Sequence, residues 1–188
     1  MSHATAHTWG ERVTTLDLDQ ERRFAAFVSD HRDRAVGMAY RLVGGDAAVA
    51  EDVAQEAFAR AYRGLARFRG DAQLSTWFYR ILVNEANRHH RFAWVRRRSP
   101  EEFPETEDTR TPPPGDPALR ARVVEALSRL SRGQRECFVL IHLEGFTVAE
   151  TAEITGRATG TIKSHLHRAL KSLREQLADL DPSPERAE

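Results

Sequence analysis

The segment SPEEFPETEDTRTPPPGDP, residues 99–117, constrains the possible fold more than any other feature of the sequence. It is rich in proline and acidic residues, and its one large apolar side chain is that of Phe103. A segment of this composition buries too little apolar surface to offset the conformational entropy lost on ordering. It therefore predicts an extended, flexible linker between two ordered blocks, residues 20–98 and 118–180.

Both blocks are expected to be helical. Apolar residues recur at intervals of three and four, and no run alternates with the period of two that a half-buried strand needs. The sequence therefore predicts an all-α fold of two small helical domains, with tails at residues 1–19 and 181–188. The expected helices span residues 20–43, 47–67, 74–93, 118–130, 132–143, 148–155 and 160–178.

The net charge of zero conceals a segregation of charge along the chain. Residues 99–118 carry one arginine and six acidic residues, whereas residues 80–98 carry six arginines and one glutamate. Nucleic-acid binding must therefore be argued from local surfaces and not from the overall isoelectric point. The single cysteine, Cys137, excludes an internal disulfide, and no signal peptide or membrane-spanning run is visible. Together these features predict a cytoplasmic protein.

The segment VAETAEITGRATGTIKSHLHRALKSL has the spacing of a helix-turn-helix. In such a motif a small residue lets the helices approach, a glycine accepts the left-handed turn, and a branched apolar residue anchors the second helix. Counted from Val148 as the first position, these residues are Ala152, Gly156 and Ile162. A capping box is expected from Thr147 and Glu150. The outward face of the second helix suits phosphate contact and base readout in the major groove. It carries Lys163, Ser164, His167, Arg168 and Lys171.

The segment STWFYRILVNEANRHHRFAWVRRR, residues 75–98, mixes aromatic residues with arginines. Helical phasing directs one face to the core, formed by Trp77, Ile81, Leu82 and Ala86 with Phe78 beside them. The opposite face carries Arg80, Asn84, Asn87, Arg88 and Arg91. Together with the loop at residues 68–75, this face predicts a surface for single-stranded nucleic acid, because arginines hold phosphates and amides read base edges.

Other candidate sites have simpler explanations. In the helix expected at 47–67, solvation alone accounts for an outer face formed by Asp52, Gln55, Glu56 and Arg60. The eight histidines lack the spacing of metal ligands, and Cys137 has no basic neighbour that would activate it. No phosphate-binding glycine loop or hydrolase motif is present in the sequence. We therefore expect no metal, no cofactor and no enzymatic activity.

Two motifs, taken in this order, closely resemble bacterial sigma factors of the extracytoplasmic-function (ECF) group. They are AEDVAQEAFARAYRGLARFRGDAQLSTWFYRILVNEANRHHR and, after the linker, LSRLSRGQRECFVLIHLEGFTVAETAEITGRATGTIKSHLHRALKSLRE. The similarity covers residues 22–98 and 118–178. It implies two helical domains, called regions two and four, and an alternative sigma factor that binds core RNA polymerase, directs it to promoters and promotes melting.

The resemblance also implies roles for individual residues. The clamp helices of the largest polymerase subunit would meet Asp52, Gln55 and Glu56, and the flap of the second largest subunit would meet region four. Melted DNA of the minus-10 element would meet Phe68, Asp71, Ala72, Gln73, Arg80, Asn84 and Arg88. The minus-35 element would meet Lys163, Ser164, His167 and Arg168. His165 stands where the family has arginine, which implies a weaker or pH-dependent phosphate contact.

The alternative interpretation is a stand-alone helix-turn-helix regulator whose N-terminal block senses a ligand or dimerises. Such a regulator binds duplex DNA without polymerase, so run-off transcription with core polymerase separates the two interpretations. The resemblance further implies an anti-sigma partner, often itself membrane-bound, whereas this chain is not expected to insert into a membrane. Regulation in trans is expected because no sensory domain follows the second helical block.

Overall fold

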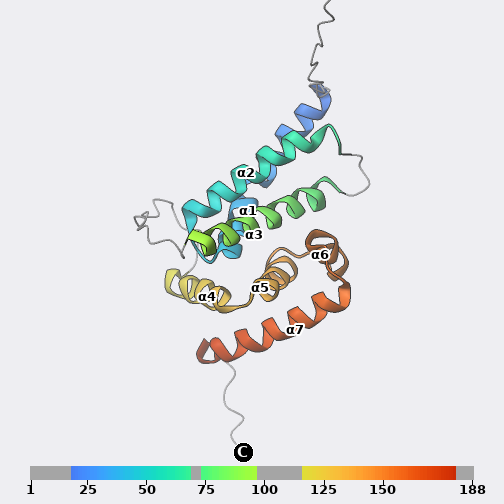
Figure 1. Cartoon of the computed structure of the whole chain (residues 1–188). Helices are drawn as coiled ribbons and strands as arrows, with labels where there is room; N and C mark the ends of the chain where they lie inside the picture. The colour runs from blue at the N-terminus through green and yellow to red at the C-terminus, as the bar shows by residue number, and fades with distance from the viewer. Residues whose placement is uncertain (1–17, 69–72, 97–115, 181–188) are drawn as a thin grey trace, which may run out of the picture.

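The computed structural model describes residues 18–68, 73–96 and 116–180 (Figure 1). All regular secondary structure in these ranges is helical, which confirms the predicted all-α class. The helices are α1 (Leu18–Val43), α2 (Ala47–Leu65), α3 (Leu74–Arg96), α4 (Pro117–Arg129), α5 (Arg132–Phe138), α6 (Val148–Thr155) and α7 (Thr159–Gln176). A π-helical turn, Val139–Leu143, continues α5, and a 3-10 turn, Ala178–Leu180, follows α7. The predicted linker and both tails lie almost entirely outside the described residues.

Helix boundaries follow from local backbone chemistry. α1 ends at Gly44 and Gly45, whose φ angles of 90° and 95° lie in the left-handed region that favours glycine. The Asp46 carboxylate then accepts a hydrogen bond from the backbone N–H of Val49 at 2.9 Å. This N-cap satisfies an N–H group that has no partner inside the helix. The chain thereby reverses, and α2 packs along α1.

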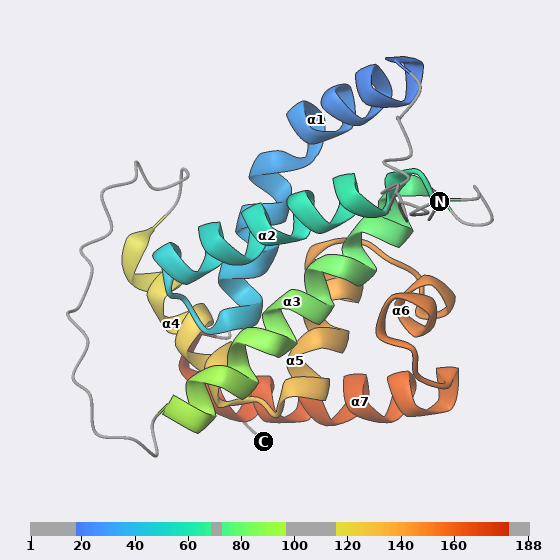
Figure 2. The same cartoon turned by 45° about the horizontal axis from the view of Figure 1, so that its top comes forward.

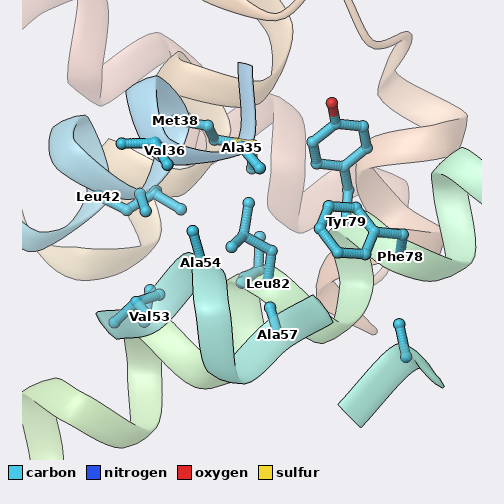
Figure 3. Close-up of a cluster of buried hydrophobic side chains, with 14 of the residues drawn as sticks. Ala35, Val36, Met38, Leu42, Val53, Ala54, Ala57, Phe78, Tyr79 and Leu82 are labelled. Atoms are coloured by element: carbon cyan, nitrogen blue, oxygen red, sulfur yellow. The ribbon is translucent and has the colours of Figure 1, made fainter. Parts of the chain in front are cut away.

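The first three helices enclose a buried hydrophobic core that includes the aromatic rings of Phe78 and Tyr79 (Figure 3). The side chains of Phe78 and Tyr79 on α3 are fully buried. The Phe78 ring stacks on Phe58 with a centroid separation of 4.4 Å and meets Phe27 edge-on at 5.3 Å. Small side chains on α2 let the helices approach this closely. The buried alanines of α2 are Ala50, Ala54, Ala57 and Ala61.

The buried face of α3 is wider than the one expected. Phe78, Leu82 and Ala86 are buried as predicted, and Trp77 and Ile81 are partly buried and pack against the same cluster, but Tyr79 and Val83 are buried in addition. The prediction treated α3 as packing only on the helices before it. In the structure α3 also contacts α6, so a second side of the helix is covered.

The helix-turn-helix forms as its spacing predicts. The Thr147 hydroxyl accepts from the backbone N–H of Glu150 at 3.2 Å, and the Glu150 carboxylate accepts from the N–H of Thr147 at 2.8 Å. Gly156 ends α6 with φ 67°, and Ile162 is fully buried at the start of α7. The predicted capping box, left-handed glycine and apolar anchor are therefore confirmed.

The two predicted domains pack against each other. Figure 2 shows α3 lying over α5, with α6 at its side; α3 contacts α6, and α1 contacts both α4 and the π-helical turn. Val139, Leu140 and Ile154 belong to the same buried cluster as the side chains of α1, α2 and α3. A smaller cluster joins α4 to α7. Within the described ranges, no helix combines the length and apolar character needed to cross a membrane.

Candidate DNA- and polymerase-binding surfaces

α7 presents its candidate DNA-binding residues on one exposed face. Lys163, Ser164, His167 and Arg168 are all exposed, while the opposite side of the helix is buried through Ile162, Ala169 and Leu173. The Ser164 hydroxyl donates to the Gly160 carbonyl at 3.0 Å. The first turn of α7 holds no acidic residue, so the positive end of the helix dipole is not neutralised there. Cationic side chains and a helix N-terminus together make this face favourable for phosphate.

His165 is not part of this exposed face. Its ring packs on α5, where a methyl group added at Gly133 would lie 3.0 Å from both Cε1 and Nε2 of the ring. The side chain is half-buried, and Nδ1 is a buried atom with no hydrogen-bond partner in the described part of the chain. The ring therefore packs between α5 and α7, and the weaker or pH-dependent phosphate contact that the family position implies stays a prediction.

α3 carries a second candidate surface. Arg80 and Asn84 are exposed, and Arg88, one turn beyond Asn84, is partly buried. The Arg88 guanidinium lies 3.6 Å from a carboxylate oxygen of Glu85, and Arg60 of α2 lies 2.9 Å from the other oxygen. Burial raises the pKa of Glu85, and the positive charge of Arg60 opposes this shift. Glu85 thus holds Arg88 close to the α2–α3 contact.

The loop before α3 is described only at its two ends. The Phe68 ring is half-buried and tilts against Trp77 at a centroid separation of 5.0 Å. Gln73 is exposed, and its carbonyl accepts from the N–H of Trp77 at 3.1 Å. Asp71 and Ala72 lie outside the described residues. Phe68 and Gln73 are therefore brought to the N-terminal end of α3.

The outer face of α2 is acidic. Asp52 and Gln55 are exposed, and Glu56 is partly exposed. The Glu56 carboxylate lies 3.0 Å from Arg60 Nε and 2.9 Å from Arg63 Nη2. The hydrogen bond from Arg60 holds the pKa of Glu56 below its ordinary value, so this carboxylate is ionised at neutral pH.

An open hollow of about 380 Å³ lies between α2 and α3. It joins the acidic face of α2 to the basic face of α3. Its lining residues are Asp52, Val53, Glu56, Glu85, Arg88 and His89. Sequence reasoning missed Glu85 and His89, although Glu85 carried one signal as the only acidic residue among the six arginines of residues 80–98.

Groups suited to catalysis or metal binding do not gather in the described ranges. Cys137 is fully buried, and burial raises the pKa of its thiol to about 11. A thiol with this pKa stays protonated at neutral pH and is a poor nucleophile. The described residues contain no group of three or more histidine, cysteine or acidic side chains arranged to hold a metal ion.

The sequence matches two family descriptions in the order of the two helical blocks. Residues 27–96 match Sigma-70 region 2, and residues 120–173 match Sigma-70, region 4. The RNA polymerase sigma-H factor of Pseudomonas aeruginosa is 31% identical over 183 residues, which cover 89% of this chain and 93% of the relative. The RNA polymerase sigma-E factor of Streptomyces coelicolor is 36% identical over 164 residues, 84% of this chain and 89% of the relative.

Solved structures agree with these relatives. The sigma factor RpoE of Bartonella quintana, solved with the anti-sigma factor NepR, aligns with a TM-score of 0.71 and 28% identity over 84% of this chain and 98% of that chain. CnrH, solved with the cytosolic domain of CnrY, aligns with a TM-score of 0.63 and 26% identity over 86% and 90%. The chain belongs to the sigma-70 family, within its ECF group. Its function is that of an alternative sigma factor, which directs RNA polymerase to promoters.

Proposed function

We propose that the exposed faces of α2, α3 and α7 divide the work of initiation among them. The acidic residues Asp52 and Glu56, with Gln55, bind the clamp helices of the largest polymerase subunit. The α3 side chains of Arg80, Asn84 and Arg88, together with Phe68, Asp71, Ala72 and Gln73 before the helix, hold the melted minus-10 element. Lys163, Ser164, His167 and Arg168 of α7 contact the minus-35 element.

The observation that carries this proposal is the segregation of charge on α2 and α3. One hollow is lined on its α2 side by Asp52 and Glu56, and on its α3 side by Arg88 and His89 with Glu85, whose carboxylate is paired with Arg60 and Arg88. The exposed Arg80 adds a further positive charge on α3. Polyanionic DNA favours the basic face and is repelled by the acidic one, which leaves the acidic face for a protein partner. Trapping an unstacked base beside α3 would offset the few kcal/mol that unpairing costs and so favour melting.

The division of the chain follows the same proposal. Residues 20–98 form the module for core polymerase and the minus-10 element, residues 118–180 form the module for the minus-35 element, and residues 99–117 tether them. Tethering raises the effective concentration of the second module once the first is bound. The flap of the second largest polymerase subunit meets the second module. Neither module is assigned a catalytic residue.

A partner that holds the factor inactive is part of the proposal. The relative RpoE was solved with an anti-sigma factor, and this chain aligns with that relative over 84% of its length. We expect a comparable partner to cover the polymerase-binding face of α2. The factor acts in the cytoplasm, where polymerase and promoter DNA meet.

Run-off transcription with purified bacterial core polymerase tests the proposal. Promoter fragments are first selected from a random-sequence library by holoenzyme assembled with this chain. The proposal requires a chain-dependent transcript of defined start and co-elution of the chain with core polymerase. Binding of the same fragments by the chain alone, as a dimer and with no chain-dependent transcript, would identify a stand-alone regulator instead.

A further inference from the structure

A buried carboxylate joins the two halves of the molecule. Glu144, between the π-helical turn and α6, has a side chain only 2% exposed. Its Oε2 atom lies 2.8 Å from Arg34 Nε, and its Oε1 atom lies 2.7 Å from Arg41 Nη2. Arg34 also donates through Nη2 to the backbone carbonyl of Glu144 at 2.5 Å. Two arginines of α1 therefore hold one carboxylate from a segment more than 100 residues further along the chain.

Aromatic rings surround this ion-pair group. Phe146 meets Tyr79 edge-on with a centroid separation of 5.3 Å. The Arg34 guanidinium lies 5.2 Å from the centre of the Tyr79 ring and 5.4 Å from that of Phe146. Such contacts strengthen when water is excluded. The same arginine thus bridges α1, α3 and the segment before α6.

A second polar contact lies at the C-terminal end of α1. Arg135 of α5 is buried, and its Nη1 donates to the carbonyl of Leu42 at 2.8 Å. Its other nitrogens donate to carbonyls at the C-terminal end of α4 and just beyond it, including that of Leu127 at 2.9 Å. Close by, a methyl group added at Gly45 would lie 2.5 Å from Val124 Cγ1 of α4. The two halves are therefore fitted closely along the C-terminal half of α1 and the turn that follows it.

This packing leaves the proposed functional faces open while fixing their separation. The α2 face and the α7 face are exposed in the packed arrangement. α6 contacts both α3 and α7, so near α6 the axes of α3 and α7 lie within about 20 Å, twice an interhelical distance of about 10 Å. The minus-10 and minus-35 elements are about 25 base pairs apart, or about 85 Å at about 3.4 Å per base pair. The packed arrangement cannot span both elements.

We propose that Glu144, held between Arg34 and Arg41, is a latch that keeps the factor closed and must release before the α3 and α7 faces engage one promoter. This inference rests on the proposed function of those two faces. The acidic α2 face is exposed in the closed form. The latch therefore prevents promoter engagement but does not prevent binding to polymerase through α2.

The chemistry of the latch makes it reversible. Removing charges from water offsets much of the attraction within a buried ion pair, so such a pair is specific in geometry without adding much net stability. Two polar groups at this contact also lack hydrogen bonds: Arg41 Nε and the Tyr79 hydroxyl are buried with no hydrogen-bond partner among the described residues. Opening returns these atoms to water, which lowers the free energy required for release.

Energy transfer between two dyes on the full-length chain measures how often the two halves are closed against each other. Dyes are placed on cysteines introduced by Ser29→Cys on α1 and Glu175→Cys on α7, both exposed positions, while Cys137 is fully buried and stays unlabelled. We expect high transfer efficiency in the wild-type background and a fall when the holoenzyme binds its selected promoter. Glu144→Gln should enlarge the open population on the order of tenfold, because two arginines lose their shared counter-charge.

Glu125→Gln is the matched control, since it removes a carboxylate from an exposed ion pair within α4 whose Arg129 and Glu125 side chains are 61% and 60% exposed. It should leave transfer efficiency unchanged. If Glu144→Gln loses its helical circular dichroism, Arg41→Gln, which removes one of the two arginines, carries the same prediction. Unchanged transfer efficiency in the folded latch variant, or low efficiency in the free wild-type chain, overturns the proposal.

The outcome is separable from that of the proposed function. If the wild-type chain gives no promoter-dependent transcript and does not co-elute with core polymerase, the proposed function fails whatever the dyes report. If the wild-type chain initiates transcription but the latch variant neither opens nor forms promoter complexes at lower concentration, only the latch is wrong.

Discussion

Arg60 Nε lies 2.9 Å from Glu85 Oε1, and this ion pair joins helix α2 to helix α3. The Glu85 side chain is 8% exposed and that of Arg60 is 40% exposed. Arg60→Met should therefore destabilise the protein by roughly 1–3 kcal/mol, because it leaves a buried carboxylate short of its main partner. Arg60→Met combined with Glu85→Met should recover most of that loss, since replacing both members of a buried pair is close to neutral. Urea unfolding of both single variants and the double variant measures the coupling.

The same pair predicts a pH dependence. Burial raises the pKa of Glu85, so its protonated form is favoured in the folded state, and this group lowers stability as the pH rises from the ordinary value of 4.5 through the folded pKa. Removing Arg60 removes a charge that lowers this pKa. The Arg60→Met variant should therefore regain stability, relative to the wild type, when the pH is lowered toward 4.5. A stability difference between the two proteins that does not change with pH would contradict the assignment to Glu85.

Gly156 offers a test of backbone conformation separate from packing. Its φ of 67° is left-handed, and a Cβ added there meets no atom within 4 Å. Gly156→Ala should cost about 1 kcal/mol through backbone strain alone. Gly160→Ala is the control, because that glycine lies in the first turn of α7, without a positive φ, and is equally open. It should be neutral or stabilising by up to about 1 kcal/mol in thermal unfolding. Equal losses in the two variants would show that the turn does not require a glycine.

The features that the sequence predicted well are those decided by neighbouring residues. The N-cap at Asp46, the left-handed glycine at position 156 and the capping box of Thr147 each depend on a few adjacent backbone groups. A few consecutive residues are therefore enough to predict them. The outward face of α7 was predicted for the same reason, since one buried stripe fixes the opposite face of a helix.

The features that were missed depend on residues far apart in the chain. Glu144 meets Arg34 across 110 positions, and nothing local in either segment indicates this partner. Tyr79 was not predicted as a core residue because its neighbour Phe146 arrives from the other half. His165 was assigned by family position, and its burial follows from Gly133, which leaves room for an imidazole. Long-range packing therefore decided what helical phasing alone could not.

The capping box of α6 makes the stability of the fold depend on pH in the acidic range. The backbone N–H and the hydroxyl of Thr147 donate to Glu150 and lower the pKa of its carboxyl from 4.5. A lowered pKa contributes stability that is present above 4.5 and lost as the pH falls through the folded pKa. Wild-type protein should lose more stability than Glu150→Gln between about pH 6 and about pH 3, with other carboxylates contributing equally to both. Thr147→Ala should cost about 1 kcal/mol at neutral pH. If the free energies of unfolding of the wild type and Glu150→Gln changed equally with pH, the capping box would not contribute to the acid sensitivity.

The acidic face of α2 predicts a defect in polymerase binding. Reversing its charge with Asp52→Arg and Glu56→Arg should weaken binding to core polymerase on the order of tenfold or more, because complementary charges steer and orient such contacts. Asp33→Arg on α1 is the control, since it reverses a side chain that is 96% exposed and lies outside this face. Fluorescence anisotropy of labelled chain with core polymerase measures the affinities, and circular dichroism checks that both variants stay helical. Equal affinity in all three proteins would mean that another surface docks on polymerase.

Replacing cations on α7 should weaken promoter binding and also change its dependence on salt. Lys163 and Arg168 lie on the exposed face of α7, and in the proposed function each phosphate that they contact releases counterions on binding. Lys163→Ala and Arg168→Ala should each reduce the slope of log affinity against log salt concentration by about one. Arg174→Ala is the control, because this exposed arginine lies in the last turn of α7, away from the helix-turn-helix turn. Holoenzyme titrations of the selected promoter fragment at several salt concentrations give the slopes. A loss of affinity with an unchanged slope would indicate base readout by these side chains in place of phosphate contact, and an unchanged affinity would exclude them from the interface.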